Sequence, residues 1–208
     1  MTRVLLADDH PVVTEGLRRI VASVPGLKVV GEARTGAEVL TQLVRNPVEV
    51  LVLDSTLPDR CPLDLLKRIA NRWPRTRVLL LGTGPDDPVA VRAIRDGAAG
   101  FAAKSQSPLE LRAAVERIAA GCRYVHPAVA ERLMFAAPGD GGPSHESLSG
   151  REFEVLCLMG AGRPPREIGP RLGISVKTVA THRARILEKL GLDCTAAAIA
   201  HAVKHGLL

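Results

Sequence analysis

Short apolar runs alternate with longer amphipathic stretches along the first 120 residues of the chain. The apolar runs predict five strands, at residues 4–7, 27–33, 50–53, 78–81 and 100–103. Helical spacing predicts five helices, at residues 11–23, 37–44, 63–72, 88–96 and 108–120. Because strands alternate with helices, the pattern predicts βαβ units and a doubly wound, five-stranded parallel α/β sheet. The strands are apolar at consecutive positions, which indicates burial on both faces of the sheet.

The pattern changes after residue 120. Residues 127–135 are predicted to form one more helix, and residues 136–144 are rich in Gly and Pro, which is typical of a linker. Beyond this segment the spacing predicts only helices, at about 149–161, 164–172, 175–190 and 195–205. We therefore expect an α/β domain at 3–120, a partly helical linker at 121–147 and a small all-α four-helix domain at 148–208.

Cap signals support the helices of the second domain. Ser149 is followed three residues later by Glu152, which is the spacing of a capping box. Ser175 is placed to cap the third of these helices, and Gly191 is placed to end it.

Positive charge is concentrated in the second domain. The chain carries a formal net charge of +6, and residues 148–208 hold nine Lys or Arg against five Asp or Glu. A basic balance suggests a polyanionic partner. Aromatic residues make up only 2% of the chain, which argues against single-stranded nucleic-acid binding because that binding relies on aromatic stacking.

Cysteine spacing and the first residues predict a cytoplasmic protein. The four cysteines are scattered and none forms a C-x-x-C pair, so we expect neither a cysteine zinc site nor a redox motif. The chain begins directly with a strand, without the apolar segment and cleavage site of a signal peptide. No apolar run reaches the roughly 18 residues that span a membrane.

Three carboxylates fall at the carboxyl ends of predicted strands, where an open parallel sheet binds its ligands. Asp8 and Asp9 follow the first strand and Asp54 follows the third, and these strands are neighbours in a flavodoxin-like order. Crowded carboxylates repel one another unless a cation lies between them, and Mg²⁺ prefers oxygen ligands. Lys104 follows the fifth strand and can pair with a carboxylate or a phosphoryl group. The set favours phosphoryl transfer onto an aspartate over the alternative of polar residues that merely end strands.

Residues 3–120 resemble the CheY-like receiver domain of two-component response regulators. The matching stretches are VLLADDHPVV at 4–13, VLVLDSTLP at 50–58 and GAAGFAAK at 97–104. The resemblance implies that Asp54 is the phosphoacceptor and that Asp9 and Asp54 are direct Mg²⁺ ligands. It also implies a water-mediated metal contact from Asp8, a ligand from the backbone carbonyl of Thr56, and pairing of Lys104 with the phosphoryl group.

Two features depart from the family pattern. The family expects Ser or Thr directly after the fourth strand, whose hydroxyl moves to the phosphoryl oxygen and releases the aromatic switch residue, here Phe101. This chain has Gly82 there; Thr83 is one residue further, where its side chain points elsewhere unless the flanking glycines bend the backbone. The loop at 57–62 reads LPDRCP and lacks the Gly residues of the family. The pocket therefore contains the residues expected to bind the metal ion and the phosphoryl group. The hydroxyl that would pass the signal from the phosphoryl group to the aromatic switch residue is missing.

The helix predicted at 175–190 has an apolar face and a polar surface. Its apolar residues recur at helical spacing and predict an inward face of Val176, Val179, Ile186 and Leu190. A shorter helix and a tight turn at Gly173 precede it, which is a helix-turn-helix arrangement whose second helix enters the major groove of DNA. The alternative is an amphipathic helix with a solvated polar face.

Residues 148–208 resemble the LuxR-type helix-turn-helix domain in its NarL/FixJ form, which favours DNA binding. The matching text is LSGREFEVL at 148–156, EI at 167–168, LGISVKTV at 172–179, His182, and KLG at 189–191. We expect DNA contacts from Lys177, Thr178, Thr181, His182, Arg183 and Arg185.

Relatives often carry Lys where this chain has Ala180, so either the affinity for DNA is lower or Arg183 and Arg185 supply the contact. His182 is as much a candidate for packing or phosphate contact as for base readout. The resemblance implies a homodimer on two half-sites, with 195–205 as the dimerisation helix.

The sequence thus predicts a DNA-binding transcription regulator controlled by phosphorylation of Asp54, with double-stranded DNA, a second copy of the chain and a sensor histidine kinase as partners. A close alternative is a regulator of the same build that is controlled by a ligand, a protein partner or dimerisation without phosphorylation. A remote alternative is an aspartate-nucleophile phosphohydrolase, but those enzymes separate their two first Asp by one residue, whereas Asp8 and Asp9 are adjacent. We expect no metabolic enzyme, because chemistry at Asp54 would be self-modification.

Overall fold

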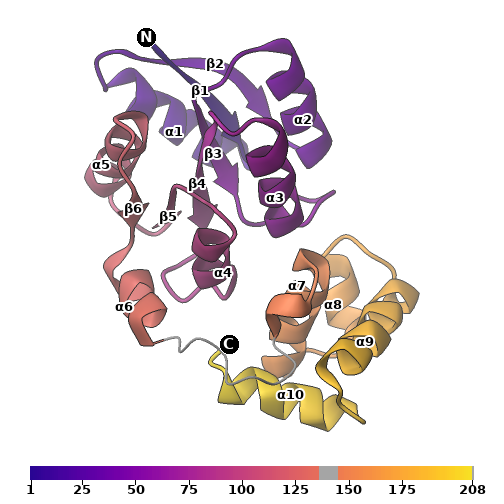
Figure 1. Cartoon of the computed structure of the whole chain (residues 1–208). Coiled ribbons are helices and arrows are strands. Elements are labelled where there is room, and N and C mark those ends of the chain that lie inside the picture. The colour runs from indigo at the N-terminus through magenta and orange to yellow at the C-terminus, as the bar shows by residue number, and fades with distance from the viewer. Residues whose placement is uncertain (136–144, 208) are drawn as a thin grey trace. The chain divides into compact units, whose positions relative to one another are not determined.

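The structure is a computed structural model that describes residues 1–135 and 145–207. The chain divides into two compact units, Met1–Glu131 and Arg132–Leu208, each of which is shown in Figure 1. The Gly- and Pro-rich segment 136–144, predicted as a linker, lies outside the described residues.

A parallel sheet forms the centre of the first unit. Its strands are β1 (Thr2–Ala7), β2 (Leu27–Ala33), β3 (Val50–Asp54), β4 (Arg77–Gly82), β5 (Gly100–Ala103) and β6 (Tyr124–Val125). They run in the order β2-β1-β3-β4-β5-β6, and every neighbouring pair is parallel. The doubly wound α/β class expected from the sequence is confirmed.

The sixth strand was not predicted. Tyr124 and Val125 pair with Gly100 and Phe101 in β5, and two residues are too short a run to produce a periodic signal. A Cβ on Gly100 would lie 2.4 Å from the carbonyl oxygen of Tyr124, so only glycine lets this edge strand approach so closely.

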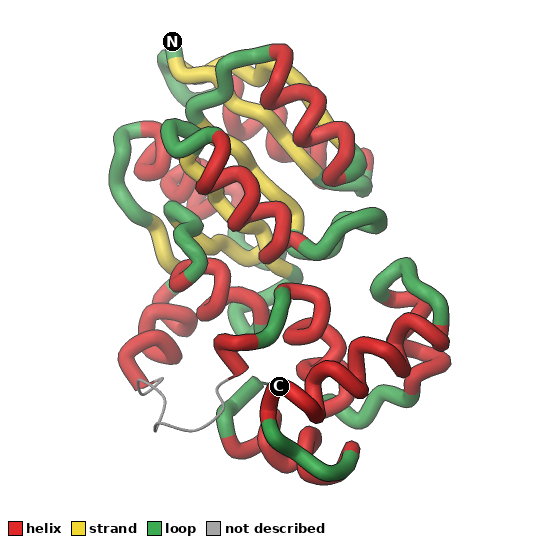
Figure 2. The backbone as a smooth tube through the Cα atoms, turned by 45° about the vertical axis from the view of Figure 1, so that its right-hand side comes forward, coloured by secondary structure: helices red, strands yellow, loops and turns green. Residues whose placement is uncertain are grey.

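Helices cover both faces of the sheet (Figures 1 and 2). They are α1 (Pro11–Ala22), α2 (Gly36–Arg45), α3 (Pro62–Arg72), α4 (Val89–Arg95) and α5 (Pro108–Ala119), and α6 (Pro127–Phe135) follows β6. On one face Val4 and Leu6 of β1 pack in a buried cluster with Leu17 of α1 and Ile118 of α5. Helices α2, α3 and α4 lie on the other face.

The second unit contains η1 (His145–Ser147), α7 (Gly150–Gly160), α8 (Pro165–Arg171), α9 (Val176–Leu190) and α10 (Thr195–Lys204). The four predicted α-helices are confirmed. Ser149 and Glu152 form the expected capping box, Ser175 caps α9, and Gly191 ends α9 in the left-handed region at φ 62°. Local cap chemistry therefore sets the ends of these helices as the sequence predicted.

Candidate functional site

The predicted carboxylates meet at one edge of the sheet. Ala7 of β1 pairs with Leu53 of β3, so Asp8 and Asp54 come next to each other where the two parallel strands end. Asp54 is fully buried and Asp8 is 2% exposed, whereas the side chain of Asp9 is 35% exposed. Ligand atoms of Asp8, Asp9, His10 and Asp54 all lie within 4.8 Å of one another. This oxygen-rich set suits a hard divalent cation such as Mg²⁺.

Lys104 lies between two of these carboxylates. Its Nζ is 2.9 Å from Oδ2 of Asp8 and 2.9 Å from Oδ2 of Asp54. The backbone N–H of Lys104 donates to the carbonyl of Gly82 at 2.8 Å, which fixes the residue at the end of β5. The structure therefore brings Asp8, Asp54 and Lys104 together as predicted.

Burial dominates the electrostatics of the pocket. It raises the pKa of Asp54, although the hydrogen bond and charge of Lys104 act in the opposite direction. Burial lowers the pKa of Lys104, but its hydrogen bonds to Asp8 and Asp54 outweigh burial and raise it overall. Asp54 is thus a carboxylate whose negative charge is only partly compensated, which favours an added cation at this site.

His10 belongs to the pocket, although no role for it is predicted from the sequence. Its Nδ1 is 3.0 Å from Oδ1 of Asp8 and 2.9 Å from Oδ1 of Asp9, and its backbone N–H donates to Asp8 at 2.8 Å. The sequence signal for its place in the pocket was its position directly after Asp8 and Asp9. An imidazole here can offset carboxylate charge when it is protonated.

Thr56 contacts the predicted phosphoacceptor through groups other than the expected carbonyl. Its hydroxyl donates to Oδ2 of Asp54 at 3.0 Å, and its backbone N–H donates to Oδ1 at 3.2 Å. These bonds orient both oxygens of Asp54. The predicted role of the Thr56 carbonyl as a metal ligand stays a prediction.

The ring of Phe101 occupies the space beside Gly82. Phe101 is fully buried, and a Cβ on Gly82 would lie 2.5 Å from its Cζ and 2.6 Å from its Cε2. Thr83, the neighbouring hydroxyl residue, is exposed. The inward ring therefore depends on the absence of a side chain at the position where the family carries Ser or Thr.

Asp87, on the loop between β4 and α4, also reaches the space beside Gly82. Oδ2 of Asp87 accepts hydrogen bonds from the Ser55 hydroxyl at 3.0 Å and from the Thr83 backbone N–H at 3.3 Å. The same oxygen lies 2.7 Å from the position of a Cβ on Gly82. Asp87 thus links this loop to Ser55, the residue after Asp54, a connection for which the sequence held no specific signal.

The unusual loop after Asp54 is anchored to α2. The carboxylate of Asp59 accepts hydrogen bonds from the backbone N–H groups of Gly36 at 2.6 Å and Ala37 at 3.0 Å, at the start of that helix. The side chain of Arg60 lies over Gly36, where a Cβ would be 2.7 Å from its Cδ. Asp59 therefore satisfies free N–H groups of α2 and fixes a loop that lacks the glycines of the family.

Helices α8 and α9 are joined by a tight turn. The backbone N–H of Ile174 donates to the carbonyl of Gly169 at 2.9 Å, and Gly173 has φ 63°. A Cβ on Gly169 would lie 2.8 Å from the carbonyl oxygen of Ile174, so glycine permits the close approach. This is the predicted helix-turn-helix geometry.

The candidate DNA-contact residues of α9 fall into two groups, one on its outward face and one on its flanks. With 3.6 residues per turn, Lys177, Thr181 and Arg185 share the face opposite the buried Val179 and Ile186. All three residues of this outward face are exposed. This face has two cations and a hydroxyl, which suit phosphate and base contacts.

The other candidates lie on the flanks of α9. Arg183 is exposed, whereas Thr178 and His182 are half-buried, and the Thr178 hydroxyl contacts the Ser175 hydroxyl at 2.8 Å. The expected inward position of Val176 is wrong, because this residue is 50% exposed. It is the first residue of α9, one turn before Val179, the first buried residue of the helix.

A parallel α/β domain with an acidic, lysine-bridged pocket, followed by a helix-turn-helix with a basic outward face, defines a two-domain DNA-binding regulator. Residues 4–116 match the family described as the response regulator receiver domain, and residues 146–202 match the family of bacterial regulatory proteins of the luxR type. The chain belongs to the response regulators that carry a LuxR-type helix-turn-helix domain, the NarL/FixJ group.

Full-length relatives support this assignment. Over 209 residues the chain is 31% identical to the response regulator UvrY of Escherichia coli strain K12, with 100% of this chain and 96% of UvrY covered. The crystal structure of the response regulator ChrA of a heme-sensing two-component system matches with a TM-score of 0.53 at 35% identity, over 99% of this chain and 98% of ChrA.

A nucleic-acid complex is also among the similar structures. RcsB from Salmonella enterica serovar Typhimurium, bound to promoter rprA in the presence of phosphomimetic BeF₃⁻, matches with a TM-score of 0.64 at 25% identity. The match covers 96% of this chain and 97% of RcsB. None of the helices in the described part of the chain combines the length and the hydrophobicity that a membrane span requires.

Proposed function

We propose that the protein is a transcription regulator whose DNA binding is controlled by phosphorylation of Asp54. The observation that carries this proposal is the position of Lys104 Nζ, 2.9 Å from both Asp8 and Asp54, at an edge where four side chains able to bind a metal ion converge. A carboxylate oxygen of Asp54 attacks the phosphorus of a phosphohistidine on a sensor kinase. The P–N bond breaks as the acyl phosphate forms, and the histidine takes up a proton.

Mg²⁺ would be held by Asp9 and Asp54 directly, by Asp8 through water, and by the backbone carbonyl of Thr56. When bound, the ion neutralises the phosphoryl oxygens during transfer. Lys104 can exchange its contact with the Asp54 oxygen for one with the new phosphoryl group and retain its contact with Asp8. The hydrogen bonds from Thr56 support this arrangement because they fix the orientation of the Asp54 carboxylate.

The output is binding of a homodimer to two half-sites on double-stranded DNA, in the cytoplasm. We infer that Lys177, Thr181 and Arg185 enter the major groove from the outward face of α9, with Thr178, His182 and Arg183 on its flanks. Helix α10 would form the dimer contact, since its exposed side includes small residues that permit close helix approach. The complex of RcsB with promoter DNA supports this mode of binding.

The fit of Phe101 beside Gly82 supports the alternative of control without phosphorylation. In that case the receiver at 3–120 would act as a dimerisation module that responds to a ligand or partner. A hollow of about 180 Å³ beside Asp8 offers room for a small polar ligand. A phosphohydrolase activity is disfavoured by the adjacency of Asp8 and Asp9, and the family membership favours a regulator that is not an enzyme.

Intact-mass measurement tests the proposal directly. The full-length protein is incubated with Mg²⁺ and acetyl phosphate, and Asp54→Asn is treated in parallel. We expect one base-labile phosphoryl adduct on the wild type and none on the variant. Asp59→Asn is the matched control, because this nearby carboxylate caps α2 and should leave the adduct unchanged.

Loss of the adduct in Asp59→Asn as well would point to loop damage and not to a specific acceptor. Failure of the wild type to form an adduct, under conditions that modify an ordinary receiver, would reject phosphorylation control. The alternative then predicts that DNA affinity is the same with and without the phosphodonor.

A further inference from the structure

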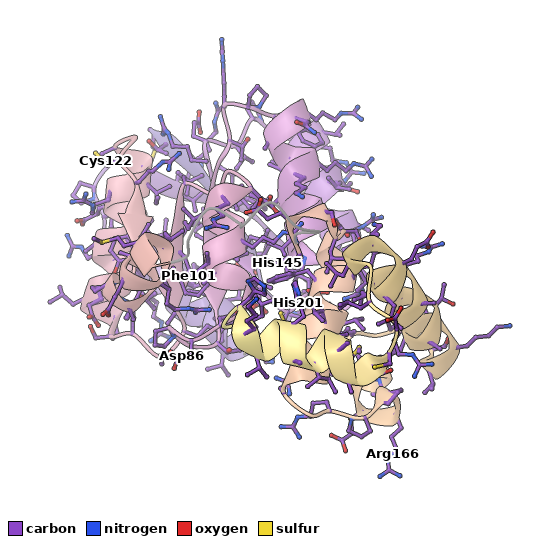
Figure 3. All side chains as sticks on the ribbon, turned by 60° about the horizontal axis from the view of Figure 1, so that its bottom comes forward. Asp86, Phe101, Cys122, His145, Arg166 and His201 are labelled. Carbon is purple, nitrogen blue, oxygen red and sulfur yellow. The ribbon has the colours of Figure 1, made fainter. Side chains whose placement is uncertain are left out.

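Three of the six histidines of the chain form a cluster in the DNA-binding unit. His145 belongs to η1, His201 lies in the last turn of α10, and His205 is the C-cap of α10. The ring centroids are 4.3 Å apart for His201–His205, 5.4 Å for His145–His205 and 6.0 Å for His145–His201. Figure 3 shows His145 and His201 beside each other at α10.

The spacing of these residues suits a shared metal ion. His201 and His205 are four residues apart, so both project from one side of the end of α10, as in helical metal-binding pairs. The third imidazole comes from a separate segment. Three imidazoles bound to one tetrahedral ion at about 2.0–2.1 Å place their ring centroids about 5 Å apart. The observed separations of 4.3, 5.4 and 6.0 Å bracket this value.

One ring nitrogen of the cluster lacks a partner that a metal ion could supply. Nε2 of His201 is buried and has no hydrogen-bond partner within the part of the chain that the structure describes. A buried ring nitrogen normally has a partner, so this atom points to a missing one. The carbonyl groups that end α10 also favour a cation at this position.

We propose that His145, His201 and His205 bind a divalent transition-metal ion of the class that prefers imidazole, with Zn²⁺ as its representative. A water molecule would complete the tetrahedron. In the structure the three rings contact one another at interplanar angles of 38°, 53° and 69°, so metal binding requires them to reorient. Three neutral nitrogen ligands exclude Mg²⁺, which prefers oxygen. This site is therefore chemically distinct from the acidic pocket at Asp54.

The ion would join two segments of the DNA-binding unit that are far apart in the sequence. His145 begins η1, four residues before the N-cap of α7, and His201 and His205 lie at the end of α10, the helix to which we assign dimer contact. Metal binding would hold these segments together and stabilise the unit.

Zinc titration of the full-length, tag-free protein tests the proposal. Millimolar Mg²⁺ is kept present to compete at the acidic pocket, and Zn²⁺ binding is followed by competition with a chromophoric chelator. We expect one Zn²⁺ per chain, with histidine ¹⁵N shifts at three rings. His145→Gln, His201→Gln and His205→Gln should each weaken binding at least about tenfold, since even the loss of an outer-shell partner has such an effect.

Two control variants separate the possible outcomes. His126→Gln removes a histidine of the other compact unit and should bind zinc as the wild type does. His10→Gln removes the imidazole of the acidic pocket and should also leave the high-affinity site unchanged. The exposed His205 is the variant least able to disturb folding, and circular dichroism checks each protein.

Zinc affinity unchanged in all three cluster variants would overturn the proposal, and so would loss of binding in His10→Gln alone. No binding by the wild type would show that the three rings only pack together. A rise in the thermal unfolding temperature with Zn²⁺, absent in His205→Gln, would support the stabilising role.

Discussion

A Cβ atom on Gly82 would lie 2.5 Å from Cζ of Phe101, which is closer than van der Waals contact allows. The inward ring and the missing side chain are therefore two parts of one packing arrangement. In the family pattern a hydroxyl at this position responds to the phosphoryl group. Here the phenyl ring fills that space, and the Ser55–Asp87 hydrogen bond connects the residue after Asp54 with the β4–α4 loop.

Gly82→Ala should destabilise the receiver by about 1–3 kcal/mol, because the added methyl overpacks a site where the ring has no room to yield. Urea unfolding of the full-length protein measures this effect, and ring signals from the three Phe residues report whether Phe101 moves. Gly84→Ala is the matched control, since a Cβ there meets nothing within 4 Å.

The energetic coupling between Gly82 and Phe101 can be measured with a double-mutant cycle. Phe101→Leu shortens the side chain, so Gly82→Ala should be less destabilising in that background than in the wild type. Equal destabilisation in both backgrounds would show that the ring does not limit space at Gly82.

Asp54→Asn should increase stability at neutral pH in the absence of divalent cations. Burial raises the pKa of Asp54, so the folded protein holds a proton there more tightly than the unfolded chain does. The stabilisation of the folded protein by this proton is complete below the unfolded pKa of about 3.9 and is lost as the pH rises through the higher folded pKa. The advantage of Asn should therefore be largest near pH 7, shrink as the pH falls through the raised folded pKa, and reach its minimum below pH ~4.

Thermal unfolding in EDTA across this pH range measures the difference. Asp86→Asn, at an exposed position of the β4–α4 loop, should show no comparable gain at neutral pH. A stability gain for Asp54→Asn that grows toward acid would contradict the assignment of buried, uncompensated charge to Asp54.

Glu152→Gln should destabilise the helical unit by about 1–3 kcal/mol. Oε2 of Glu152 accepts hydrogen bonds from Lys189 Nζ at 2.6 Å and from the Ser149 backbone N–H at 2.8 Å, in a residue only 3% exposed. Burial raises the pKa of Glu152, but these bonds outweigh it and lower the pKa. The stabilisation is therefore present above the unfolded pKa and is lost as the pH falls through the lower folded pKa.

Glu167→Gln provides a matched comparison in the same unit. Glu167 also forms one ion pair, with Arg163 at 3.4 Å, but both side chains are about half exposed. Its replacement should change stability by less than about 1 kcal/mol. Similar unfolding midpoints for the two variants in denaturant would show that burial does not strengthen the Glu152 contacts.

Lys177→Ala and Arg185→Ala should each weaken DNA binding across sequences and reduce the salt dependence of the affinity. Each lost phosphate contact lowers the slope of log K against log salt by about 0.9. Fluorescence anisotropy on a DNA duplex at several salt concentrations measures the slope. Arg112→Ala, on α5 of the receiver, is the control and should keep the wild-type slope.

Local patterns predicted most of the fold. Strand runs, helical spacing and cap residues such as Ser149 act over a few residues, so their signals are visible in the chain itself. The pocket of Asp8, Asp54 and Lys104 was also predictable, because parallel strands bring their carboxyl ends to one edge. The short strand β6 was not, since its existence depends on the close approach that Gly100 permits.

Contacts between distant segments were decided by the tertiary structure. Nothing in the sequence linked Asp59 to the start of α2, Asp87 to Ser55, or His145 to the end of α10. The exposure of Val176 was misjudged because helical spacing defines a face but not how far packing extends along it. The sequence by itself determined the order of elements and the family of the protein through short-range chemistry. Only the folded chain decided which loops and side chains meet, because those contacts depend on the shape of the whole domain.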